Sequence, residues 1–161
     1  MTSRVPVYDT GMLIALADRN AKAVRLHTGL KDTPHRALVL GPVLAQVWRP
    51  SPATVHALAG VMKDCTVPQV RSSAPAMRPT GVGQTACIMC ATGPDSTEWQ
   101  RIGSALGAAE LPPEKRPDAV HALVALTAAR HGSAVVFTSD PADLDAYLKA
   151  LDAKDVHVVQ I

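Results

Sequence analysis

Short apolar blocks alternate with amphipathic segments along most of the chain. Blocks rich in Val, Leu and Ala that are bounded by turn residues predict buried strands. The block at Ala134–Phe137 is the clearest of these signals. The predicted strands are Val5–Tyr8, Ala37–Leu40, Thr66–Val70, Ala134–Phe137 and Val156–Gln160.

The segments between these strands are predicted to be helices, because their apolar residues have helical spacing and helix-ending residues follow them. Pro42 suits the first position of a helix, where its missing N–H costs nothing, and Pro50 and Pro52 end that helix. The segment Asp118–His131 is apolar nearly all round, so we expect a largely buried helix that ends at Gly132. The other predicted helices are Met12–Ala17, Ala21–Leu30, Thr54–Met62 and Ala142–Leu151.

The order of these elements predicts the fold class. Strands that alternate with helices imply βαβ units with right-handed crossovers and a parallel sheet. We therefore expect an α/β fold, with one three-layer α/β/α domain over residues 1–161 and a central, mainly parallel sheet. Residues 72–116 are irregular and divided by prolines, which suggests an extended helical insertion. Two helices are predicted inside it, one over Gln84–Ala91 and one after the capping signal Asp95-Ser96-Thr97-Glu98.

Composition narrows the class of protein. The chain has 161 residues, which suits one domain, and 47% of them are apolar, which excludes disorder throughout. The net charge of +2 permits contact with nucleic acid without arguing for it, because dedicated binders usually concentrate basic residues on one face. No signal peptide and no membrane-spanning run is visible, so we expect a cytoplasmic protein.

The cysteines do not describe a disulfide framework, since there are only three of them, Cys65, Cys87 and Cys90. The spacing of Cys87 and Cys90 matches half of a zinc or redox site. No second pair and no close histidine cluster supplies the other half. Buried thiols on a helix are therefore the favoured interpretation.

Three aspartates are expected to meet at one edge of the sheet. Asp9 and Asp140 each follow a predicted strand, and ligands of open parallel sheets bind beyond the carboxyl ends of the strands. The Asp118 helix feeds the Ala134–Phe137 strand through a short turn, so helix and strand run antiparallel. A helix of this length covers about 21 Å, and the returning strand with its turns covers about 20 Å. Asp118 is therefore expected near Asp140.

Such convergence carries an electrostatic cost. Two carboxylates about 5 Å apart repel by about 3 kcal/mol at an effective dielectric of 20. An all-oxygen cluster that recruits a cation suits Mg²⁺ or Mn²⁺, and such an ion can activate a water for attack on a phosphodiester. Taken singly, each aspartate also suits a plain role at a helix N-terminus. Taken together at one edge, they favour the metal site.

At these residues the sequence resembles the PIN-domain family, particularly the VapC-type toxins of toxin–antitoxin pairs. The first motif is matched by VYDTGMLIALADR, which carries Asp9, and the second by VLGPVLAQVWRP. The third and fourth are matched by PDAVHALVALTAARHGSAVVFTSDPADL, which carries Asp118 and Asp140. The match covers about residues 5–50 and 117–159, and residues 72–116 match poorly.

The resemblance implies a Mg²⁺- or Mn²⁺-dependent endoribonuclease that cleaves RNA by a metal-activated water. It also implies a homodimer that an antitoxin protein inhibits, with Asp9, Asp118 and Asp140 as catalytic metal ligands. Gln46 stands where the family carries a glutamate, and His121 stands where relatives often carry another acid. Hydroxyl groups near the acids are expected to hydrogen-bond the carboxylates or a phosphate: Thr10, Thr138 and Ser139.

Other hypotheses about the function also agree with the sequence. Gln46, His121 and the irregular 72–116 segment also suit a non-catalytic PIN-like module that binds RNA or a protein. A haloacid-dehalogenase-type phosphatase would need an acid where Gly11 stands, and Asp9-Thr10-Gly11 does not supply the glycine pattern of a dinucleotide-binding loop. Asp143 is expected to face solvent, while His121 is expected to pack or to hydrogen-bond a metal ligand.

Overall fold

One sheet of five parallel strands forms the centre of the molecule, in the order β3-β2-β1-β4-β5. The structure, a computed structural model, describes residues 4–49, 51–68 and 92–161. The central strands are apolar because a parallel sheet is covered on both faces, and every residue of β1 and β2 is buried. The strands are β1 (Val5–Tyr8), β2 (Ala37–Val39), β3 (Cys65–Thr66), β4 (Ala134–Thr138) and β5 (Val156–Gln160).

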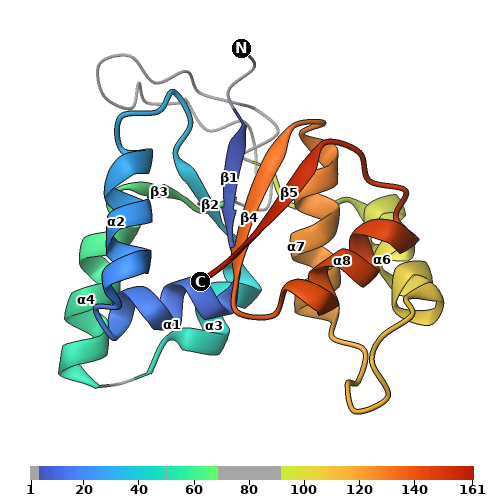
Figure 1. Ribbon diagram of the computed structural model, residues 1–161, viewed down its shortest axis with the longest axis horizontal. Helices are drawn as coiled ribbons and strands as arrows, with labels where there is room; N and C mark the ends of the chain where they lie inside the picture. The colour runs from blue at the N-terminus through green and yellow to red at the C-terminus, as the bar shows by residue number, and fades with distance from the viewer. Residues whose placement is uncertain (1–3, 50, 69–91) are drawn as a thin grey trace.

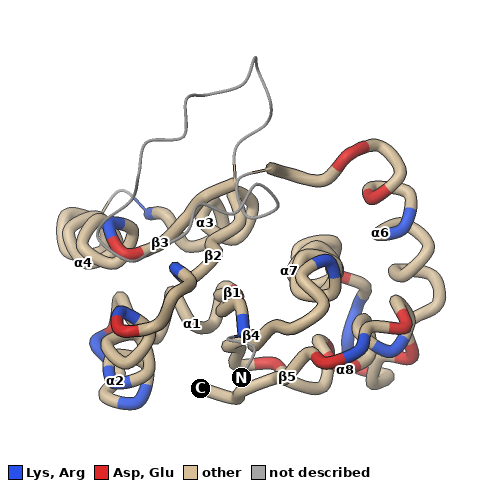
Figure 2. The backbone as a smooth tube through the Cα atoms, turned by 90° about the horizontal axis from the view of Figure 1, so that it is seen from above, with Lys and Arg blue, Asp and Glu red and all other residues tan. Residues whose placement is uncertain are grey.

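Two groups of helices flank the sheet, and Figure 1 shows them on either side of it. The first group is α1 (Thr10–Ala17), α2 (Ala21–Leu30), α3 (Gly41–Val47) and α4 (Pro52–Met62). The second group is α6 (Ser96–Ala108), α7 (Ala119–Arg130) and α8 (Pro141–Ala150). The view from above in Figure 2 shows the same separation. The expected three-layer α/β/α fold is thus confirmed, and the described sheet is wholly parallel rather than mainly so.

Most predicted elements are observed, with differences at their ends. The helix α1 begins at Thr10 rather than Met12, and β3 is shorter than predicted, ending at Thr66. Helices α4 and α8 both begin at a proline, which needs no hydrogen-bond partner in a first turn. The predicted helix Gln84–Ala91, with Cys87 and Cys90, lies outside the described residues. None of the described helices is long and apolar enough to cross a membrane.

The strand order reverses beside β1, and this reversal locates the candidate site. After β1 the chain builds β2 and β3 on one side of it, and then returns to place β4 on the other side. The carboxyl ends of β1 and β4 therefore form a topological switch point, the place where open α/β sheets bind ligands. Asp9 follows β1 directly, and Asp140 comes two residues after the end of β4.

Helix α7 brings the third aspartate to the same edge. Its residues 122–128 are all buried, as its apolar sequence predicts, so the helix runs through the interior. It ends at Arg130, and Gly132 follows two residues later with a φ of 67°, in the left-handed region that favours glycine. The chain then enters β4 antiparallel to the helix, which returns it to the edge where α7 began.

Helix α6 is fixed at its start by reciprocal hydrogen bonds. The Asp95 carboxylate accepts from the Glu98 N–H at 2.9 Å, and the Glu98 carboxylate accepts from the Asp95 N–H at 3.0 Å. Glu98 also pairs with Arg130 of α7 at 2.9 Å. The predicted capping signal is confirmed, and the Glu98–Arg130 ion pair joins α6 to α7.

Removing this cap should destabilise the fold. The substitution Asp95→Ala deletes the acceptor of the Glu98 N–H and should lower the free energy of unfolding by about 1 kcal/mol. Asp95→Asn keeps an acceptor and should lie within a few tenths of the native value. Urea denaturation followed by circular dichroism measures both, and an equal loss in the two variants would contradict the capping role.

Candidate functional site

Asp9 is a buried carboxylate at the end of the central strand, with 1% of its surface exposed. The Thr138 hydroxyl donates to Asp9 Oδ2 at 2.7 Å, and His121 Nε2 lies 3.3 Å from the same oxygen. Among the described residues, the other oxygen, Oδ1, is buried without a hydrogen-bond partner. Asp9 therefore offers one satisfied oxygen and one that still needs a donor or a cation.

The surroundings of Asp9 favour its charged form. Burial opposes ionisation, but the contacts from His121 and Thr138 outweigh it and lower the pKa of Asp9 below its ordinary value. Burial likewise acts to lower the pKa of His121. Asp9 first, and then Asp118 and Asp143, outweigh that effect and raise the pKa of His121 above its ordinary value. The two shifts agree, because each group stabilises the charge of the other.

Asp118 lies at the start of α7, with its carboxylate facing the same centre. One oxygen accepts from the Val120 N–H at 2.7 Å, so Asp118 caps the helix, and the other lies 3.9 Å from His121 Nδ1. The backbone N–H of Asp118 donates to the Tyr147 hydroxyl at 2.8 Å, which ties this end of α7 to α8. The cap and the site are therefore compatible roles for one side chain.

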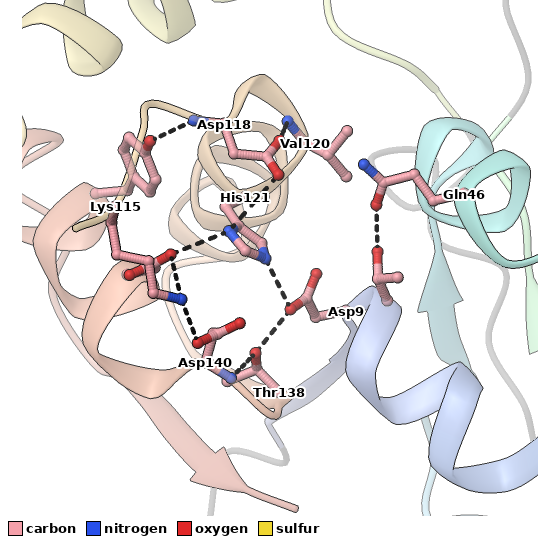
Figure 3. Close-up of polar contacts among 11 residues, drawn as sticks. Asp9, Gln46, Lys115, Asp118, Val120, His121, Thr138 and Asp140 are labelled. Carbon is pink, nitrogen blue, oxygen red and sulfur yellow. Dashed lines mark hydrogen bonds and ion pairs between the residues drawn. The ribbon is translucent and has the colours of Figure 1, made fainter. Parts of the chain in front are cut away.

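Asp140 is held in place through Thr138 and paired with a lysine. The backbone N–H of Asp140 donates to the Thr138 hydroxyl at 3.0 Å, so one threonine positions both Asp9 and Asp140. Lys115 Nζ lies 2.7 Å from Asp140 Oδ1 and 3.5 Å from Asp143 Oδ2. The hydrogen bond with Asp140 raises the pKa of Lys115 above its ordinary value. Figure 3 shows the arrangement around His121.

The expectation that Asp143 faces solvent is wrong. It is 4% exposed, and its Oδ2 lies 3.7 Å from His121 Nδ1. Asp143 lies in the first turn of α8, which packs closely on α7, so its side chain turns towards α7 and His121. The site therefore contains four carboxylates rather than three.

The remaining predicted site residues lie at the same edge with different partners. The Thr10 hydroxyl donates to the Gln46 side-chain oxygen at 2.6 Å, so it bonds the amide rather than an acid. Gln46 on α3 borders the acids from the side of α1, as Figure 3 shows. Ser139 packs against Gly11, while Thr138 bonds Asp9 as expected.

The sequence analysis did not identify Lys115 or Tyr147 as residues of the site. It named Asp143 but did not predict that Asp143 is buried there. Lys115 lies in the Pro-rich stretch before α7, where no periodic pattern predicts its position. The spacing of Asp143 and Tyr147 from Asp140 did carry a signal, because positions three and seven residues on share one helix face with it. Treating that face as buried would have found both.

The donor chemistry of the site fits a divalent cation. All four acids offer carboxylate oxygens, which Mg²⁺ and Mn²⁺ prefer, and Asp9 Oδ1 is buried with no partner among the described residues. In the arrangement described, no three acidic, histidine or cysteine side chains within residues 4–49, 51–68 and 92–161 have the geometry of a metal site. His121 lies between Asp9 and Asp118, and Lys115 pairs with Asp140, so a histidine and a lysine contact the acids.

Comparison of the chain with family models, with curated proteins and with solved structures finds no match. The resemblance to the PIN-domain family therefore rests on the motifs of the sequence.

The close approach of Gly11 to Ser139 should control the geometry of this edge. A Cβ at Gly11 would lie 2.3 Å from Ser139 Oγ and 2.7 Å from its backbone nitrogen, so Gly11→Ala must displace the turn after β4. We expect Gly11→Ala to lower the free energy of unfolding by about 1–3 kcal/mol.

Gly29→Ala is the matched control, because Gly29 is exposed in α2 and a Cβ there meets nothing within 4 Å. It should raise the free energy of unfolding by up to about 1 kcal/mol, since alanine favours the helix. Thermal and urea denaturation of both variants measure the difference, and effects of the same sign would contradict the role of Gly11.

Proposed function

We propose that this chain is a Mg²⁺- or Mn²⁺-dependent endoribonuclease of the PIN type, which cleaves phosphodiester bonds in RNA. The observation that carries the proposal is the convergence of Asp9, Asp118 and Asp140 at the switch point of the sheet. The buried, unpartnered Oδ1 of Asp9 supports it, since a metal ion would satisfy that oxygen. The motifs that resemble the PIN family contain the same three aspartates.

Each residue of the site has a distinct role in the proposed reaction. Asp9, Asp118 and Asp140 would hold the ion, and Gln46 would add a neutral oxygen at the border of the site. Thr138 orients Asp9 by its hydrogen bond to Oδ2, and His121 lies 3.3 Å from the same oxygen, which leaves Oδ1 for the ion. The ion, when bound, activates a water for attack on phosphorus and neutralises charge on the phosphate. The resemblance extends the proposal to a homodimer that an antitoxin protein inhibits.

The second candidate is a non-catalytic PIN-like module that binds RNA or a protein. Two observations favour it: Lys115 already neutralises part of the acidic charge, with His121 against Asp9, and Gln46 offers no charge where the family carries a glutamate. Calorimetric titration with Mn²⁺ separates the candidates. The nuclease should bind Mn²⁺ below millimolar concentration, and the module with an intact fold should not.

Substitution of Asp9 tests the nuclease directly. Purified protein with Mn²⁺ should cleave single-stranded RNA, and Asp9→Asn should reduce the rate by more than about 100-fold, because even the outer partners of metal ligands account for 10- to 100-fold. Asparagine keeps an acceptor for Thr138, so the fold should persist, which circular dichroism verifies.

The control is Asp152→Asn, on an exposed turn after α8 and remote from the acids. Asp152 has a φ of 49°, a conformation that asparagine also tolerates. This variant should cleave RNA at the native rate. Equal cleavage by the native protein and by Asp9→Asn would overturn the nuclease assignment, because the activity would then come from a contaminant.

A further inference from the structure

Lys115 is presented to the acidic site by a tight turn. The turn runs over residues 112–115, and the Lys115 N–H donates to the Pro112 carbonyl at 2.9 Å. Pro113 occupies its second position, where the fixed φ of proline favours such a turn. Lys115 is therefore directed by local backbone structure, and its side chain reaches α8 from the segment before α7 (Figure 3).

The two acids that Lys115 contacts need a positive charge. Asp143 has only 6% of its side chain exposed, and its Oδ1 is buried without a hydrogen-bond partner among the described residues. A buried carboxylate is unfavourable unless a cation or several donors accompany it. Lys115 lies 3.5 Å from Asp143 and 2.7 Å from Asp140, so it bridges the pair. A bridging metal ion would make the same two contacts.

The site thus has two halves with different needs. Asp9 and Asp118 face His121, and Asp9 keeps an unpartnered buried oxygen on that side. Asp140 and Asp143 face Lys115, which already supplies one positive charge, and Asp143 Oδ2 also lies 3.7 Å from His121 Nδ1. Four carboxylates set against Lys115 leave three negative charges before His121 is counted. One divalent ion on the first half therefore brings the site close to neutrality, and a second ion would require Lys115 to leave.

We propose that Lys115 takes the place of a second metal ion between Asp140 and Asp143, so that the native site holds one divalent ion. That ion is held by Asp9, Asp118 and the remaining oxygen of Asp140. This inference rests on the proposed metal-dependent function and names its metal stoichiometry. Lys115 is a positioning residue here, because it acts through the two aspartates.

Mn²⁺ stoichiometry tests the inference, with isothermal calorimetry for the count and electron paramagnetic resonance for the spectrum. The native protein should bind one ion with the spectrum of an isolated Mn²⁺. Lys115→Met keeps the side-chain length without the charge, and it should bind a second ion, with the spectrum of a coupled pair. Lys115→Arg keeps the charge and should bind one ion.

The control for general loss of charge is Lys149→Met. Lys149 lies in the last turn of α8, remote from the acids, and pairs with the exposed Glu110 at 2.8 Å. This variant loses the same charge from a more exposed ion pair, and it should bind one ion as the native protein does. Two ions in this control would overturn the specific role of Lys115.

A double variant covers the case in which Lys115→Met fails to fold because Asp143 is left buried and unpaired. Lys115→Met with Asp143→Asn removes both the cation and the buried charge, and it should fold and bind one ion, since the second position has lost a ligand. One ion bound by a folded Lys115→Met with native affinity would overturn the inference and leave the metal-dependent function standing. So would two ions bound by the folded double variant. No Mn²⁺ bound by any folded variant or by the native protein would overturn the function itself.

Discussion

The meeting of three elements depends on the contacts of one carboxylate buried at the end of the central strand. Asp9 is 1% exposed, and a carboxylate in such a place is unfavourable by several kcal/mol unless hydrogen bonds and positive charge offset the loss of water. Thr138 supplies the hydrogen bond, and His121 lies at ion-pair distance. Each comes from a different element, so the ends of β1, β4 and α7 are held together by a single side chain.

That constraint explains the small residues around it. The turns after β1 and β4 must approach closely for Thr138 to reach Asp9, and Gly11 lies against Ser139 with no room for a side-chain carbon. Thr138 then serves twice, since its hydroxyl donates to Asp9 and accepts from the Asp140 N–H. The geometry of two acids is therefore determined by backbone contact between two neighbouring turns.

Features that depend on the order of elements along the chain or on periodic patterns could be predicted from the sequence. The five strands follow from short apolar blocks, and the meeting of Asp9, Asp118 and Asp140 follows from their positions relative to parallel strands. Lys115 did not follow, because its place depends on a proline turn and on contacts with a helix 25 residues further along. The burial of Asp143 was missed although its helical spacing carried the signal, because Asp143 and Tyr147 share one face of α8 with Asp140.

The same charges connect stability with function. With only acids at this edge, repulsion would oppose the approach of β1, α7 and α8, whereas His121 and Lys115 let these elements pack before any ion is bound. The histidine and the lysine differ in how tightly they are held. His121 has 14% of its side chain exposed among three carboxylates, and Lys115 has 36% exposed at the end of a flexible stem. Lys115 fills the half of the site at Asp140 and Asp143, so an entering divalent ion would take the half at Asp9, whose Oδ1 has no partner among the described residues. The folded site is assembled by its own side chains, and the lysine determines how much of it remains available to metal.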